Sequence, residues 1–158
     1  MRKVGLVLVI ALFGTSAPAQ PNFTGDAFLI GRWQCSLDRP GQARQREDAE
    51  YRLVLNGRWI KLHYQVGRDA ATMAETDAYE TFDSKLGKWV YSSFRSDGTY
   101  GTAYSDGWRG NKKIYSSLDS PGRQLITTRV SDHRFTEQIA VAEGAAEKTA
   151  FFLDCSKQ

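Results

Sequence analysis

The chain has 158 residues, of which 41% are hydrophobic and 25% are charged, and its formal net charge is +3. This length suits one compact domain with a single core. A nearly balanced charge does not supply the one-sided basic surface that nucleic-acid binding requires, so no nucleic-acid partner is expected. We interpret the basic residues, including Arg109, Lys112 and Lys113, as solvated loop charges.

The amino terminus has the pattern of an export signal. Met1 to Lys3 is cationic, Val4 to Phe13 is almost continuously apolar, and Ala17-Pro18-Ala19 has the small-x-small pattern of a cleavage site. The apolar run is about half as long as a membrane-spanning helix. We therefore predict a signal peptide over residues 1–19, cleaved near Ala19, and a periplasmic or secreted domain over residues 20–158 without stable membrane insertion. An uncleaved membrane anchor is the alternative.

Ten strand candidates follow a short helical turn near Thr24 to Ile30, which Thr24 or Asp26 would cap. Turn dipeptides such as Asn56-Gly57 separate the strands, and residues 38–48 form one long polar connection. Short, evenly spaced strands without a long amphipathic helix are typical of an antiparallel barrel or sandwich. The candidates are residues 30–37, 49–55, 58–66, 76–83, 88–95, 99–106, 111–118, 123–131, 134–142 and 148–155.

Two cysteines, Cys35 and Cys155, lie near the two ends of the predicted domain. In an oxidising compartment an isolated pair is most simply a disulfide, whereas a redox-active pair is usually close in sequence, as in Cys-x-x-Cys. A bridge would bring the first and last strands within about 7 Å, Cα to Cα. A sheet whose first and last strands meet is a closed barrel, so we predict an all-β, antiparallel up-and-down barrel of about 8–10 strands, closed by this disulfide.

Turn chemistry also predicts which side chains face the interior. A two-residue turn at Asn56-Gly57 pairs Leu53 with Ile60 and Tyr51 with Leu62. These apolar side chains then share one face of the hairpin with Leu55. We predict that this face belongs to the core.

A second predicted face combines aromatic rings with an acid and a base. The face follows from two predicted turns. A four-residue turn at residues 84–87 joins the first two strands, and a two-residue turn at Asp97-Gly98 joins the second to the third. The second turn pairs Arg95 with Tyr100 and Tyr91 with Tyr104 on the same face. The face could line a cavity for a planar or apolar ligand, or it could be a half-exposed surface where aromatic pairs stabilise the sheet. The candidate ligand-binding residues are Glu80, Phe82, Trp89, Tyr91, Arg95, Tyr100 and Tyr104.

The order of aromatic residues and turns resembles a known family. Gly31-x-Trp33 after a short helical turn looks like the opening of lipocalin-type, calycin-like barrels. Residues 79–108 are similar to a widespread bacterial exported family of unknown function, thought to share a lipocalin-like barrel, through an aromatic-Asp turn, an aromatic strand, an Asp-Gly turn and Gly107-Trp108. Residues 129–141 fit that family's later hairpin.

This resemblance implies a lipocalin-like barrel and structural roles for Gly31 and Trp33. In lipocalins the tryptophan fills the closed end of the barrel, often under an arginine from a late strand, which here would be Arg129 or Arg134. The resemblance implies no activity.

The sequence contains no recognisable catalytic motif. It has no Gly-x-Ser-x-Gly and no glycine-rich phosphate loop before a helix. Glu80 and Asp83 are expected on opposite faces of a strand, with Asp83 shaping a turn. His63 is expected to face solvent and His133 lies in a turn, so we predict no metal site and no cofactor. A hydrolase or isomerase is the alternative to a protein without catalytic activity.

These observations lead to two functional hypotheses. The first is non-catalytic binding of a small apolar or amphipathic molecule inside the barrel. The second is a protein–protein interaction or structural module of the cell envelope, with Trp59, Trp108 and the tyrosines as surface anchors.

Overall fold

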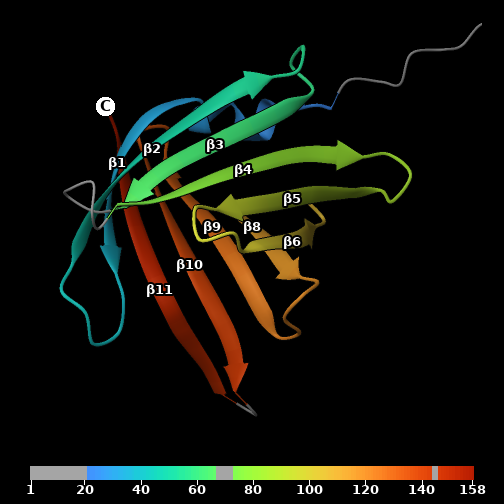
Figure 1. The fold of residues 1–158 in the computed structure, drawn as a ribbon. Coiled ribbons are helices and arrows are strands. Elements are labelled where there is room, and N and C mark those ends of the chain that lie inside the picture. Colours follow the sequence, from blue (N-terminus) through green and yellow to red (C-terminus); the bar gives the residue numbers. More distant parts are fainter. Residues whose placement is uncertain (1–20, 67–72, 144–145) are drawn as a thin grey trace, which may run out of the picture.

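The computed structural model describes residues 21–66, 73–143 and 146–158. The predicted export signal at residues 1–19 lies outside these ranges. The described chain forms one antiparallel sheet of 11 strands that curls into a closed barrel (Figure 1). The elements are η1 (Thr24–Leu29), a 3₁₀ helix, and the strands β1 (Gly31–Asp38), β2 (Gln45–Val54), β3 (Trp59–Val66), β4 (Ala74–Asp83), β5 (Lys88–Arg95), β6 (Tyr100–Ser105), β7 (Trp108–Arg109), β8 (Lys112–Ser117), β9 (Arg123–Ser131), β10 (Arg134–Glu143) and β11 (Ala146–Lys157).

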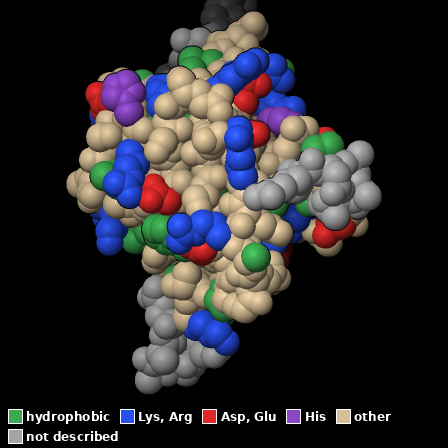
Figure 2. Space-filling model, turned by 90° about the vertical axis from the view of Figure 1, so that its left-hand side faces the viewer, with side chains coloured by type: hydrophobic (Ala, Val, Ile, Leu, Met, Phe, Trp, Pro, Cys, Tyr) green, Lys and Arg blue, Asp and Glu red, His purple; other side chains and the backbone are tan. Residues whose placement is uncertain are grey.

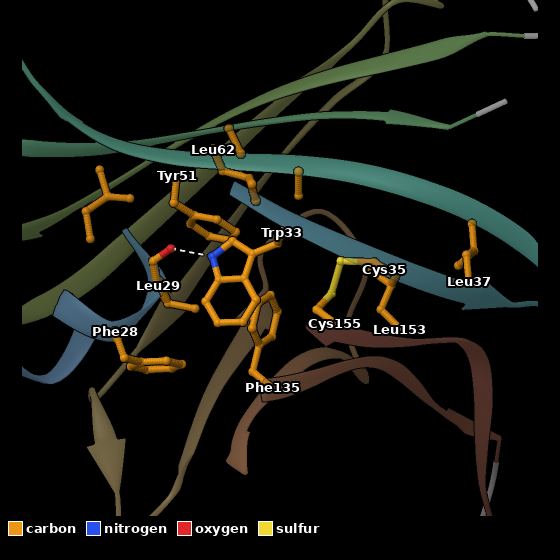
Figure 3. Packing of buried hydrophobic residues seen from close by; sticks show 13 residues of the cluster. Phe28, Leu29, Trp33, Cys35, Leu37, Tyr51, Leu62, Phe135, Leu153 and Cys155 are labelled. Atoms are coloured by element: carbon orange, nitrogen blue, oxygen red, sulfur yellow. Dashed lines mark hydrogen bonds between the residues drawn. A yellow bond between two sulfur atoms is a disulfide. The ribbon is translucent and has the colours of Figure 1, made fainter. Parts of the chain in front are cut away.

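The ring closes where the first strand meets the last. Each strand pairs with its neighbours in sequence, except that β6 pairs with β8 and the two-residue β7 pairs with β8 alone. β1 pairs with β11, and Cys35 lies directly opposite Cys155 in that ladder, at a Cα–Cα distance of 4.0 Å. The two cysteines form a disulfide (Figure 3). The predicted up-and-down barrel and its disulfide are confirmed.

The strand β2 begins earlier than predicted. Residues 38–48 were expected to form a polar connection, but β2 starts at Gln45, which pairs with Leu37 of β1. Two features conceal the strand in the sequence. Its inward position carries a glutamate, Glu47, and its outward positions carry Arg46 and Asp48, which form an ion pair. A run of charged residues therefore looks like a loop.

The β2–β3 hairpin has the predicted register. Leu53 pairs with Ile60, and Tyr51 pairs with Leu62. Tyr51, Ile60 and Leu62 are buried as expected, but Leu53 and Leu55 are 49% and 65% exposed. Leu55 is in the loop after β2, and Leu53 belongs to the second-last pair of the ladder before that loop, so this part of the predicted core face was wrong.

The β5–β6 hairpin has a three-residue loop instead of the predicted two-residue turn. The Gly98 N–H donates to the Arg95 carbonyl at 2.9 Å, and the Arg95 N–H donates to the Thr99 carbonyl at 2.9 Å. Gly98 has φ +82°, in the left-handed region where glycine is favoured. A three-residue hairpin loop with glycine in this conformation is a common alternative to the two-residue turn.

The extra loop residue shifts the register by one and exchanges the faces of β6. Tyr100 pairs with Phe94, and Tyr104 pairs with Val90, so the predicted pairings with Arg95 and Tyr91 were wrong. The small residues of β6 now face the interior, and both tyrosines belong to the outer face of the strand.

The closed end of the barrel is built around Trp33. This side chain is fully buried, and its indole N–H donates to the Leu29 carbonyl of η1 at 2.6 Å. Its ring meets Phe135 of β10 edge to face, with ring centres 4.7 Å apart, and Phe28 also packs edge to face against Phe135, with ring centres 6.4 Å apart (Figure 3). The short helix η1 therefore plugs this end. Its N-cap residue is Phe23, which makes no side-chain capping hydrogen bond, so the prediction that Thr24 or Asp26 caps the helix was wrong. The Thr24 N–H donates to the side chain of Asn22 at 3.0 Å.

A lysine, not an arginine, covers Trp33. The Lys157 ammonium group lies 5.3 Å from the centre of the Trp33 ring and donates to the Phe28 carbonyl at 2.9 Å. Arg129 lies over Phe28, 4.7 Å from the ring centre, and Arg134 forms an ion pair with Asp154. The expectation that Arg129 or Arg134 covers Trp33 was therefore wrong.

Gly31 makes room for this lysine. Its φ of +129° is a conformation that side-chain-bearing residues rarely adopt. A Cβ atom at this position would lie 3.1 Å from Cε of Lys157. Gly31, Trp33 and Lys157 thus form one packed unit at the closed end.

Candidate functional site

A cavity of about 560 Å³ occupies the end of the barrel opposite η1. All ten strands of the ring contribute to its lining. Small-molecule sites in proteins commonly enclose about 300–1,000 Å³. The space is therefore large enough for a small organic ligand.

The two sides of the cavity differ in chemistry. Tyrosines line one side: the hydroxyl groups of Tyr64 and Tyr91 are 3.4 Å apart, and the rings of Tyr91 and Tyr115 have centres 5.4 Å apart. Aliphatic and aromatic side chains from β1, β9, β10 and β11 line the other side. These apolar residues are Leu37, Leu125, Ile139, Phe151 and Leu153.

The rim of the cavity carries charges of both signs. Its cations are Arg39, Arg95 and Arg123, and its acids are Glu75, Asp97 and Asp119.

Figure 2 shows the face on the left of Figure 1, where basic and acidic side chains are interspersed and hydrophobic side chains are scattered in small groups. That face therefore carries no extended region of a single charge.

Glu47 is a buried acid that reaches this cavity. It projects from the inner face of β2, is 3% exposed and lines the cavity. The residues that the structure describes supply its carboxyl group with neither a hydrogen bond nor an ion pair. Burial raises the pKa of Glu47 to about 8; the charge of Glu137 adds to this effect, and Arg39 opposes it.

A second buried acid, Glu137 of β10, lies near Glu47 but has partners. Its Oε1 atom accepts hydrogen bonds from the Thr127 hydroxyl at 3.1 Å and from the Tyr51 hydroxyl at 3.4 Å. Burial raises the pKa of Glu137 to about 7, although both hydrogen bonds favour the ionised form.

A buried lysine connects the two carboxylates nearest the closed end. Lys113 of β8 is 1% exposed, lies 2.9 Å from Oδ1 of Asp26 and forms an ion pair with Glu80. Its ammonium group is 3.9 Å from the centre of the Trp89 ring, and the Trp108 indole N–H donates to Asp26 at 2.7 Å. The expectation that Lys113 is a solvated loop charge was wrong. Burial raises the pKa of Glu80, and the positive charge of Lys113 opposes that shift.

The predicted ligand-binding residues fall into different places. Tyr91 lines the cavity, and Arg95 and Tyr100 lie at its rim, with Tyr100 71% exposed. Glu80 and Trp89 face the interior, where they contact Lys113.

The other two predicted residues lie away from the cavity. Phe82 is opposite Trp89, as predicted, and packs against it at the closed end, with ring centres 5.7 Å apart. Tyr104 is on the outer face and lines a separate pocket of about 310 Å³ with Ile114. Whether any of the seven residues binds a ligand stays a prediction.

Several residues of the cavity were not predicted from the sequence. Glu47 lay in the supposed connection, and Tyr64 was not among the candidate ligand-binding residues. Two tryptophans were expected to be surface anchors. Trp108 instead packs edge to face against Phe28, with ring centres 5.6 Å apart, and its indole N–H donates a hydrogen bond to Asp26. Trp59 is half-buried.

Asp83 and His63, which were considered for catalysis or metal binding, have local hydrogen-bond or ion-pair partners. Asp83 accepts hydrogen bonds from the Lys85 and Leu86 N–H groups and so shapes its turn. His63 lies 2.8 Å from Asp77, which also pairs with Lys61. Within residues 21–66, 73–143 and 146–158, no group of three or more His, Cys, Asp or Glu side chains is placed to hold a metal ion. Over the same residues no helix is long and apolar enough to cross a membrane.

Comparison with known proteins does not assign the chain to a family. No protein-family model matches the chain, and no curated protein matches it. Among solved structures, a redesigned β-barrel aligns with a TM-score of 0.45 and 12% identity, over 84% of this chain and 93% of that chain. At this similarity the fold assignment rests on the strand pairings themselves. Membership of the lipocalin-like bacterial family stays a prediction.

Proposed function

We propose that the protein is an exported, non-catalytic binding protein that holds a small amphipathic molecule in the open end of its barrel. The observation that carries this proposal is the cavity of about 560 Å³ with an apolar side and a tyrosine-lined side. Apolar surface supplies most of the binding free energy in such sites, and a few polar groups orient the ligand.

The export part of the proposal has its own support. The amino terminus has the pattern of a signal peptide, and the domain contains a disulfide between Cys35 and Cys155. Structural disulfides persist in oxidising compartments and are rare in the cytosol of most organisms. Fractionation of cells that express the full chain tests it: the protein is expected outside the cytosol without residues 1–19, and a cytosolic, full-length product would contradict it.

A cavity-filling substitution tests the binding function. Leu125→Trp on β9 places a large side chain in the cavity, whereas Ile126→Trp places the same side chain on the outer face of the same strand. Isothermal titration with alkyl and aryl amphiphiles is expected to show binding to the wild type and to Ile126→Trp, and its loss in Leu125→Trp. Equal binding by all three proteins would place the ligand outside the barrel, and absence of binding to the wild type across the panel would refute the function.

A further inference from the structure

Glu47 differs from the other buried acids of the barrel. Asp26 and Glu80 share the charge of Lys113, and Glu137 accepts hydrogen bonds from Thr127 and Tyr51. Glu47 is as deeply buried, yet no described residue pairs with its carboxyl group. Since this carboxyl group lines the cavity, a polar group of a bound ligand has room to pair with it.

The residues around Glu47 favour a positively charged ligand group over a negatively charged one. A buried carboxyl group without a partner is costly to ionise, and a positive charge nearby removes much of that cost. Glu137 adds negative potential, and the tyrosine faces of Tyr64 and Tyr91 attract cations through their π electrons. An anionic head group would instead meet the repulsion of Glu47.

We propose that the ligand is an amphipathic amine whose ammonium group pairs with the carboxylate of Glu47 while its apolar part lies against the side of the cavity formed by Leu125, Ile139 and Phe151. This inference rests on the proposed binding function and specifies the chemical class of the ligand. The arginines at the rim do not replace the amine: Arg39, the cation that acts on Glu47, is exposed to solvent.

Binding of such an amine releases a proton. In the empty cavity at neutral pH Glu47 holds its proton, because burial raises its pKa to about 8. The arriving R–NH₃⁺ ion pairs with the carboxylate, and the carboxyl proton leaves to solvent, so charge and protons balance. The groups that interact electrostatically with Glu47 are Glu137 of β10, Arg39 after β1, Tyr51 of β2 and Tyr64 of β3, and Tyr91 of β5 lines the same cavity. Glu137 also ionises in this range and strengthens the same trend, whereas burial keeps all three tyrosines neutral there.

Matched probes separate charge from shape. Octylamine, octanol and octanoate share one chain, and 2-phenylethylamine, 2-phenylethanol and phenylacetate form an aryl set. At about pH 8.5 calorimetry is expected to show each amine binding at least about tenfold more tightly than its alcohol, with the carboxylate weakest. Lowering the pH to about 6 is expected to weaken the amine about tenfold or more and to change the alcohol by less than about threefold.

Two substitutions on one strand assign the effect to Glu47. Glu47→Gln is expected to remove both the preference for the amine and its dependence on pH, while binding of the alcohol is retained. Glu50→Gln, on the outer face of β2, is expected to leave both properties unchanged. Thermal unfolding of both variants checks that they fold, and Glu47→Asp, which keeps the charge, is expected to retain part of the preference.

The outcomes distinguish this inference from the function on which it rests. If no probe binds to the wild type, the proposed function fails. If the alcohols or carboxylates bind as tightly as the amines, or if Glu47→Gln keeps the preference for amines, the ligand class is wrong and the binding function stands.

Discussion

The ammonium group of Lys113 lies 3.9 Å from the centre of the Trp89 ring, in a position where the lysine is 1% exposed. The same group pairs with Asp26 and Glu80, so one buried cation balances two buried carboxylates. Ion pairs of this kind are worth little compared with apolar packing but are strongly destabilising when half of the pair is removed.

Lys113→Met is therefore expected to destabilise the fold. The substitution fills similar volume but leaves Asp26 and Glu80 buried without a cation, at a cost of about 3–5 kcal/mol in the free energy of unfolding. Urea unfolding near neutral pH measures it. Lys112→Met, on the exposed face of the same strand, is the control and is expected to change stability by less than about 0.5 kcal/mol. Equal stability of the two variants would show that the ion pairs do not form.

Gly31→Ala is expected to lower stability through both backbone strain and a steric contact. The position has φ +129°, and the new methyl group would lie 3.1 Å from Cε of Lys157. Gly41→Ala isolates part of the backbone effect, because Gly41 has φ +75° and no atom within 4 Å of the added Cβ. We expect a loss of about 2 kcal/mol for Gly31→Ala and about 1 kcal/mol for Gly41→Ala in denaturant unfolding. A smaller loss at Gly31 than at Gly41 would contradict the packing against Lys157.

The stability of the fold is expected to fall as the pH rises from about 4.5 to 8. Glu47 and Glu137 have pKa values raised to about 8 and about 7 from the ordinary value of 4.5. The folded protein therefore binds more protons than the unfolded chain in this range, so each unit of pH increase lowers the free energy of unfolding. Glu47→Gln is expected to raise that free energy by about 2 kcal/mol or more at about pH 8.5 and by little at about pH 5.

Thermal unfolding across this pH range measures the effect. Glu50→Gln serves as the control because its side chain lies on the outer face of β2 and is paired with Arg32. A wild-type stability that is constant between about pH 5 and 8 would show that Glu47 and Glu137 are not buried as described.

Removal of the disulfide is expected to destabilise the barrel by about 2–5 kcal/mol, measured by urea unfolding of a Cys35→Ala/Cys155→Ala variant. The two cysteines are separated by 120 positions, and both are buried, at 3% and 0% exposure. Peptide mapping of the unreduced protein is expected to recover the two cysteine peptides joined, and thiol labelling after denaturation without reductant is expected to find no free thiol. Two labelled thiols in the denatured, unreduced protein would contradict the closure of the ring by this bond.

The strands and their order could be predicted from the sequence because local chemistry determines both. Asn56-Gly57 defines a hairpin and its register by itself, and the alternation of side chains then assigns the core face. The seam between β1 and β11 was also predictable, because a disulfide between Cys35 and Cys155 allows few other arrangements.

Two parts of the interior could not be predicted. Asp97-Gly98 is compatible with a two-residue or a three-residue loop, and this single-residue difference decides which tyrosines face the cavity. Charged residues at inward positions also look like surface residues in a strand pattern. Lys113 is buried because of Asp26 and Glu80, which are 87 and 33 positions away, so no local pattern reveals it.

The pairing of β1 with β11 also constrains how the chain reaches its native state. Hairpins of consecutive strands can form from neighbouring segments of the chain. β1, in contrast, has an unpaired edge until the last strand, β11, is present. Contacts between distant segments raise the contact order and slow folding. Before closure the molecule is a curled sheet with two unprotected edges, and such edges can pair with other chains. Rapid oxidation of the two thiols would trap the completed ring, so the yield of soluble protein should depend on how quickly its surroundings oxidise cysteine.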